Sequence, residues 1–175
     1  MSENAYRIAV LTKYVPDTQF EQKLDDTLRV DRSESVMSEL DEYAVEAAMQ
    51  IVEAEDTDAE NSAVIAFTLG AADASKGLRR ALQLGAHEGV HILDDAFAGA
   101  DALATSRIIA AALSTYEQEH GTFDLILTGM ASTEGETSLV PVQVSELLGR
   151  TGISQVASLT VAGRTVRARR DLDTR

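Results

Sequence analysis

The pattern H-E-x-x-H, from His87 to His91, is the first candidate for chemistry in this sequence. On a helix its two histidines lie one turn apart and bind one zinc ion, and its glutamate acts as a base. Here Gly85 ends a helical segment just before the pattern, Gly89 lies inside it, and residues 90–93 are typical of a strand. Residues four apart in a strand are separated by roughly 13 Å, too far to share a metal. We therefore expect a turn that enters a buried strand; a zinc hydrolase is an alternative that a metal assay would test.

The sequence holds no other strong catalytic motif. It has no cysteine, which excludes thiol catalysis, zinc-thiolate sites and disulfides. It lacks the G-x-S-x-G turn of many serine hydrolases, the phosphate-binding P-loop and the glycine fingerprint of dinucleotide enzymes. We therefore expect no catalysis by this chain alone.

The chain is acidic, with 15 basic and 29 acidic residues and a net charge of −14. This charge disfavours binding to nucleic acid or to an anionic membrane and would suit a basic protein partner, although solubility alone also accounts for it. No apolar run reaches the ~18 residues of a membrane span, so we expect no membrane insertion. The N-terminus lacks the basic start and apolar core of a signal peptide, and we expect a cytoplasmic protein.

Hydrophobic patterning predicts strands that alternate with helices. The expected strands are 6–12, 62–68, 90–93 and 125–128, with a short edge strand at 27–30, and the expected helices are 41–55, 73–84, 101–120 and 138–148. Ser38 is the expected cap of the first helix, with Asp41 completing a capping-box-like start. Residues 155–161 and 165–170 predict a C-terminal β-hairpin. The order predicts one α/β nucleotide-binding domain over residues 1–175: an open, mostly parallel sheet with helices on both faces, similar to the Rossmann and adenine-nucleotide α-hydrolase layouts.

Three loops after predicted strands are suited to a ligand, because open parallel sheets bind ligands beyond the carboxyl ends of their strands. They follow Leu11, Thr68 and Thr128. The third runs into the helix expected near Ser138, whose free amides would favour a phosphate. We expect Glu134 and Glu136 of this loop to point to solvent; an ordinary βα loop is the alternative interpretation.

Five segments resemble the β subunit of electron-transfer flavoproteins, in that family's order and spacing and over nearly all of the chain. They are T-K-Y-V-P-D at 12–17, D-E-Y-A-V-E-A-A at 41–48, L-R-R-A-L-Q-L-G-A at 78–86, D-L-I-L-T-G at 124–129 and R-D-L-D at 170–173. The segment at 78–86 is the most specific. In the family the next residue is usually Asp, so His87 replaces it and the H-E-x-x-H pattern arises incidentally.

The resemblance implies a non-catalytic subunit of an αβ heterodimer that accepts electrons from acyl-CoA or other dehydrogenases and passes them to a respiratory or other acceptor. The α subunit would hold most of the FAD, and the β subunit would hold a structural AMP. Carried over residue by residue, the nucleotide positions would be Leu11, Ser38, Glu39, Leu40, Asp41, Leu69, Gly129, Met130, Ala131, Ser132, Thr133, Glu134, Gly135, Glu136, Thr137, Ser138, Leu139 and Val140.

The chain departs from the family pattern in three places. The family often has N-P-F where this chain has Ser38, Glu39 and Leu40. The loop at 134–140 partly resembles that of electron-bifurcating relatives, which hold a second FAD in place of AMP, so both nucleotides stay open. The family also continues past residue 175, so we expect a truncated subunit.

A second class of protein has a related layout. Universal-stress-protein-type sensors are stand-alone adenine-nucleotide binders, and they usually carry a G-x-x-G phosphate loop late in the chain. That loop is absent here, and the mass of any small molecule released on denaturation would separate the two classes.

Overall fold

A four-stranded parallel sheet forms the centre of the structure, a computed structural model that describes residues 4–26 and 28–170. Its strands are β1 (Arg7–Thr12), β4 (Ala63–Leu69), β5 (Glu88–Ile92) and β6 (Leu125–Thr128), in the spatial order β5-β4-β1-β6. All three pairings are parallel. The predicted parallel sheet is therefore confirmed.

The strand order creates a switch point beside β1. From β1 the chain builds outward through β4 to β5, then returns to add β6 on the opposite side of β1. In register, Leu11 of β1 lies between Phe67 of β4 and Thr128 of β6. The connections after β1 and β6 therefore diverge at the carboxyl edge of the sheet, where folds of this kind bind ligands.

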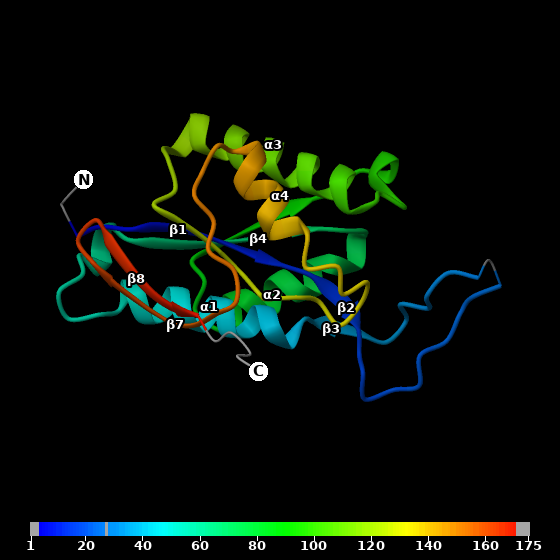
Figure 1. Ribbon diagram of the computed structural model, residues 1–175. Coiled ribbons are helices and arrows are strands. Elements are labelled where there is room, and N and C mark those ends of the chain that lie inside the picture. Colours follow the sequence, from blue (N-terminus) through cyan, green and yellow to red (C-terminus); the bar gives the residue numbers. More distant parts are fainter. Residues whose placement is uncertain (1–3, 27, 171–175) are drawn as a thin grey trace, which may run out of the picture.

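Helices cover both faces of the sheet (Figure 1), as predicted. They are α1 (Glu39–Val52), α2 (Ser75–Gln83), α3 (Ala102–His120) and α4 (Val140–Leu147), with 3₁₀ turns at Ala59–Asn61, Ala72–Ala74 and Asp95–Phe97. On the α1 and α2 face, Val10 and Val64 pack against Val45 and Leu78. On the α3 and α4 face lies a second core that includes Leu11, Phe67, Leu113 and Val144. Alternation along each strand thus supplies a hydrophobic core on each face of the sheet.

The predicted C-terminal hairpin is also present, as β7 (Val156–Ala162) and β8 (Thr165–Arg170). It lies on the α1 side of the sheet (Figure 1) and packs Leu159 and Val161 against that core. The Tyr6 hydroxyl donates a hydrogen bond to the Gly163 carbonyl at 3.0 Å, and Arg164 forms an ion pair with Asp124. These contacts hold the hairpin near the amino end of the sheet, away from the switch point.

A two-stranded ribbon, β2 (Tyr14–Pro16) and β3 (Ser35–Met37), joins β1 to α1. Between its strands the chain makes a long excursion that extends away from the body (Figure 1). The expected edge strand at 27–30 is wrong: Leu28 adopts a left-handed φ of 60°, and Val30 makes only an isolated bridge to Leu24. Residue 27 itself lies outside the described residues.

In the part of the chain that the structure describes, no helix is long and apolar enough to cross a membrane.

Candidate functional site

The Asp41 carboxylate joins three segments at the switch point. It accepts hydrogen bonds from the backbone N–H of Lys13 at 2.8 Å, just after β1, and of Gly129 at 3.1 Å, just after β6. Because Asp41 belongs to the first turn of α1, this clamp fixes the helix against the ends of both strands. The predicted role of Asp41 in a capping box is therefore wrong, since its carboxylate is engaged by distant amides.

Burial raises the pKa of Asp41 from 3.8 to about 6, although the two amide hydrogen bonds and the Lys13 charge act to lower it. A carboxylate that gives up water needs several donors to remain ionised. Here the backbone supplies two of them, so Asp41 is a structural anion and has little capacity left for a ligand.

Gly129 fits beneath this clamp only because it lacks a side chain. A Cβ at this position would lie 2.4 Å from Asp41 Oδ1 and 3.0 Å from the carbonyl carbon of Leu40. The loop after β6 can therefore start close against α1 only with glycine.

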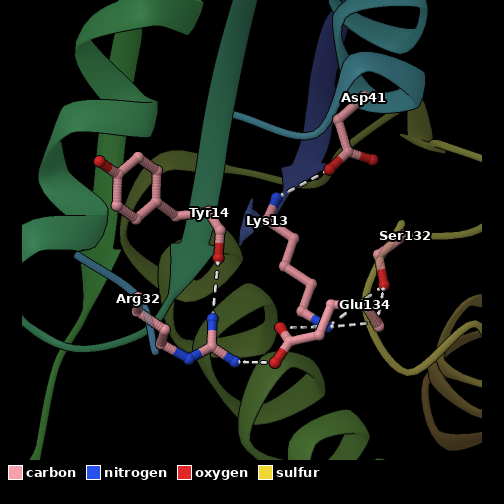
Figure 2. Close-up of polar contacts among 6 residues, drawn as sticks. All are labelled: Lys13, Tyr14, Arg32, Asp41, Ser132 and Glu134. Carbon is pink, nitrogen blue, oxygen red and sulfur yellow. Dashed lines mark hydrogen bonds and ion pairs between the residues drawn. The ribbon is translucent and has the colours of Figure 1, made fainter. Parts of the chain in front are cut away.

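Two cations converge on the loop beyond Gly129, as Figure 2 shows. The Lys13 ammonium lies 3.4 Å from Glu134 Oε2 and donates hydrogen bonds to Ser132 Oγ at 3.2 Å and to the Glu134 carbonyl at 2.9 Å. The Arg32 guanidinium pairs with the other Glu134 oxygen and donates to the Tyr14 carbonyl at 3.4 Å. The expectation that Glu134 points to solvent is wrong, because these two cations draw it inward. Glu136 is exposed, as expected.

The loop itself has an unusual backbone. Gly135, Glu136 and Ser138 all have left-handed φ angles, of 81°, 42° and 52°, which cost free energy in residues other than glycine. Consequently α4 begins at Val140 with Leu139 as its cap, two residues later than the helix start expected near Ser138. A Cβ on Gly135 would meet no atom within 4 Å, so its backbone conformation, and not crowding, favours glycine there.

A cleft of about 330 Å³ opens beside Glu134, between this loop and the excursion that follows β2. Thr133, Glu134 and Gly135 line one side. Thr18, Gln22 and Lys23 lie among the residues of the other side. The cleft is therefore lined by polar side chains and by one charged group of each sign, Lys23 and Glu134.

The other predicted nucleotide positions differ in how far their side chains are buried. Leu11 is 8% exposed and Leu69 is partly buried, so mainly backbone is available at these strand ends. Ser38 is the cap residue of α1, but its fully buried hydroxyl makes no capping bond and has no partner among the described residues. Glu39 and Met130 are exposed, and Leu40 is half-buried against Gly129. The remaining loop residues are exposed or half-buried, and of them only Thr133 lines the cleft: Ala131, Thr133, Thr137, Ser138 and Leu139.

The H-E-x-x-H pattern enters a strand, as predicted: His87 precedes β5 and the other four residues lie on it. His87 Nδ1 accepts a hydrogen bond from the Val64 N–H at 3.0 Å, and His91 Nε2 is 3.0 Å from the Gly70 carbonyl. The two rings thus have separate backbone partners. The strand, β5, is an edge strand and only partly buried, in contrast to the buried strand expected. Among residues 4–26 and 28–170, no group of three His, Asp or Glu side chains is arranged to hold a metal.

Sequence reasoning missed Lys13 and Arg32 as members of this site. Lys13 belongs to the T-K-Y-V-P-D segment at 12–17, directly after β1, and its position at the carboxyl end of a strand could have indicated a site residue. Arg32 offered none, since it lies 102 residues from Glu134 on an irregular excursion.

A family model described as the electron transfer flavoprotein domain matches residues 27–175. The electron transfer flavoprotein subunit beta of Mycobacterium leprae is 37% identical over 169 residues, which cover 95% of this chain and 62% of that protein. The chain belongs to the electron transfer flavoprotein family. The resemblance to β subunits that the five segments indicated is confirmed, and the chain spans less than two thirds of the length of this relative.

Two further electron transfer flavoprotein relatives carry other names. Protein FixA of Bradyrhizobium diazoefficiens is 32% identical over 139 residues, which cover 78% of this chain and 46% of that protein. The caffeyl-CoA reductase-Etf complex subunit CarD of Acetobacterium woodii is 32% identical over 170 residues, which cover 95% of this chain and 62% of that protein.

Proposed function

We propose that this chain is the β subunit of a heterodimeric flavoprotein electron carrier and catalyses no reaction of its own. Family membership and the subunit names of its relatives support this proposal. The partner would be an electron-transfer flavoprotein α subunit that holds most of the FAD. Acyl-CoA or other dehydrogenases would reach the β subunit through that complex.

The carboxyl edge of the sheet would hold an adenine nucleotide, with AMP favoured over a second FAD. The observation that carries this part is the convergence of Lys13 and Arg32 on a glycine-containing loop at the β1–β6 switch point. Open parallel sheets bind nucleotides at such a point, and ammonium and guanidinium groups suit phosphate oxygens. Backbone groups at Leu11 and Leu69 would contact the adenine.

The first experiment identifies the small molecule. Protein purified without added nucleotide is denatured, and the released compounds are measured by mass spectrometry. AMP is the expected compound; FAD would replace AMP in the proposal, and release of neither, with no binding on titration, would refute the nucleotide site.

A matched pair of variants then tests the position. Lys13→Met removes a cation that would contact the phosphate, and loss of a hydrogen bond to a charged group costs about 1.5–3 kcal/mol, or roughly 10- to 150-fold in Kd. Lys76→Met is the control, because Lys76 lies on α2 and pairs with Asp73. Equal AMP affinity in both variants would place the nucleotide elsewhere.

The partner proposal needs its own measurement. Mixing the chain with a flavin-bearing α subunit should give a complex by analytical ultracentrifugation, while the isolated chain should bind little FAD. Turnover of an acyl-CoA or nicotinamide substrate by the isolated chain would contradict the non-catalytic role, and AMP binding without any α-subunit complex would favour the stand-alone sensor.

A further inference from the structure

One carboxylate, that of Glu134, is shared by two cations from separate segments. Lys13 comes from the end of β1, Arg32 from the excursion before β3, and Glu134 from the loop after β6 (Figure 2). The Glu134 side chain is 21% exposed, against 43% for Lys13 and 49% for Arg32. The anion is thus the inner member of the cluster, and the cations cover it.

The Glu134 carboxylate is not fully compensated by hydrogen-bond donors. Its Oε2 is buried without a hydrogen bond, 3.4 Å from the Lys13 ammonium, whose charge also acts on Asp41. Burial of a carboxylate oxygen costs free energy unless donors compensate it. Glu134 is therefore an incomplete counter-ion for a site that could accept a better-placed anion.

The same cluster is what ties the loop to the body. Within the described part of the chain, residues 130–138 make no backbone–backbone hydrogen bond. The hydrogen bonds and ion pairs that join them to other segments involve Lys13, which holds Ser132 and the Glu134 carbonyl, and Arg32, which pairs with the Glu134 carboxylate. A loop held in this way can move once the side-chain contacts are exchanged.

We propose that Glu134 is an internal competitor for the phosphate of the nucleotide: it occupies the Lys13–Arg32 cation pair in the empty protein and is displaced when the phosphate binds. This inference rests on the proposed nucleotide site. The phosphate takes over both cations, the Glu134 carboxylate turns to solvent, and residues 130–138 rearrange around the ligand. Glu134 thereby lowers the affinity for anions that cannot compensate its displacement.

The direction in which the AMP affinity changes in a Glu134 variant tests this proposal. Glu134→Gln removes the competing charge at nearly constant shape, so AMP should bind roughly two- to tenfold more tightly, the gain expected when two partly exposed ion pairs no longer compete. Adenosine, which has no phosphate, should bind the variant and the parent equally. Glu146→Gln makes the same charge change at an exposed position of α4 and should leave both affinities unchanged.

Salt provides a second readout, since screening weakens the competing ion pairs. The AMP advantage of Glu134→Gln should shrink as sodium chloride is raised. If AMP binds the parent and Glu134→Gln with the same Kd at low salt, or if adenosine gains as much as AMP, the competitor role is overturned.

Backbone ¹⁵N relaxation of the ligand-free protein separates this inference from the proposed function, because it reports the motion of the loop directly. The order parameters of residues 130–138 should fall in Glu134→Gln and in Lys13→Met, but not in Glu146→Gln. The first two variants then diverge: Glu134→Gln gains AMP affinity and Lys13→Met loses it, which simple loosening of the loop would not produce. Failure of AMP to bind any variant would refute the nucleotide site and the displacement together, whereas AMP binding with unchanged loop order parameters in Glu134→Gln would refute the competitor alone.

Discussion

The Asp41 carboxylate accepts a hydrogen bond from the backbone N–H of Gly129, a residue 88 positions later in the chain. The same carboxylate accepts from the N–H of Lys13, so one side chain closes the junction of α1, β1 and β6. The geometry of the candidate site depends on this junction, because the loop after β6 starts there.

Gly129→Ala should destabilise the protein. The added Cβ would lie 2.4 Å from Asp41 Oδ1 and 3.0 Å from the Leu40 carbonyl carbon, so the clamp must open. Overpacking of this kind costs about 1–3 kcal/mol, to which a lost hydrogen bond adds about 1 kcal/mol. Gly89→Ala is the control, since its Cβ would meet Leu78 at 3.5 Å or more. Urea unfolding measures both; equal midpoints would show that the junction adapts without cost.

The stability contribution of Asp41 should depend on pH. The unfolded carboxyl titrates near 3.8 and the folded one near 6, so the native state binds more protons between these values. The contribution is therefore fully present below about pH 4 and is lost as the pH rises through about 6. A difference of this size between the folded and unfolded pKa of Asp41 corresponds to about 3 kcal/mol. The free energy of unfolding of the parent minus that of Asp41→Asn should fall by about this amount from about pH 4 to about pH 8; a constant difference would contradict it.

His87→Ala should cost about 1 kcal/mol, because the Val64 N–H loses its acceptor. His87→Asn should restore most of the loss, since its side-chain oxygen can occupy the place of the imidazole Nδ1. The aspartate expected in the family at this position would serve in the same way. Urea unfolding of the three proteins measures the effect. A deficit in the asparagine variant as large as that in the alanine variant would show that the ring stabilises by packing.

The Tyr116 hydroxyl should ionise at a higher pH than that of an ordinary tyrosine. Its hydroxyl donates to Glu88 Oε2 at 2.7 Å, and desolvation together with this carboxylate raises its pKa from 10.0 to about 12. The stability that Tyr116 contributes is present below about pH 10 and is lost as the pH rises through about 12. An ultraviolet titration should show a late phase that disappears in Tyr116→Phe and moves to lower pH in Glu88→Gln. No change in Glu88→Gln would leave desolvation as the whole cause.

The two central strands, β1 and β4, could be predicted from sequence because they are buried on two faces and have continuous apolar runs. Val10 and Val64 are fully buried, and the bounds of β1, β4 and β6 differ from expectation by one residue at most. The contacts of the site could not be predicted in this way. Asp41 was assigned a local role in capping because local patterns are visible in sequence, whereas its partner Gly129 is brought close only by the fold. Likewise, nothing near Glu134 in sequence indicates Arg32.

The sheet order also sets when the junction can form during synthesis. β1 is the first strand of the sheet to be made and β6 the last, yet they are neighbours. A nascent chain that has reached α3 already contains β1, α1, β4 and β5, but it lacks Gly129. Until β6 emerges, one edge of β1 has no strand beside it, and the Asp41 carboxylate lacks one of its two donors. The junction at the carboxyl edge therefore cannot be complete before β6 has been made, 88 residues after Asp41.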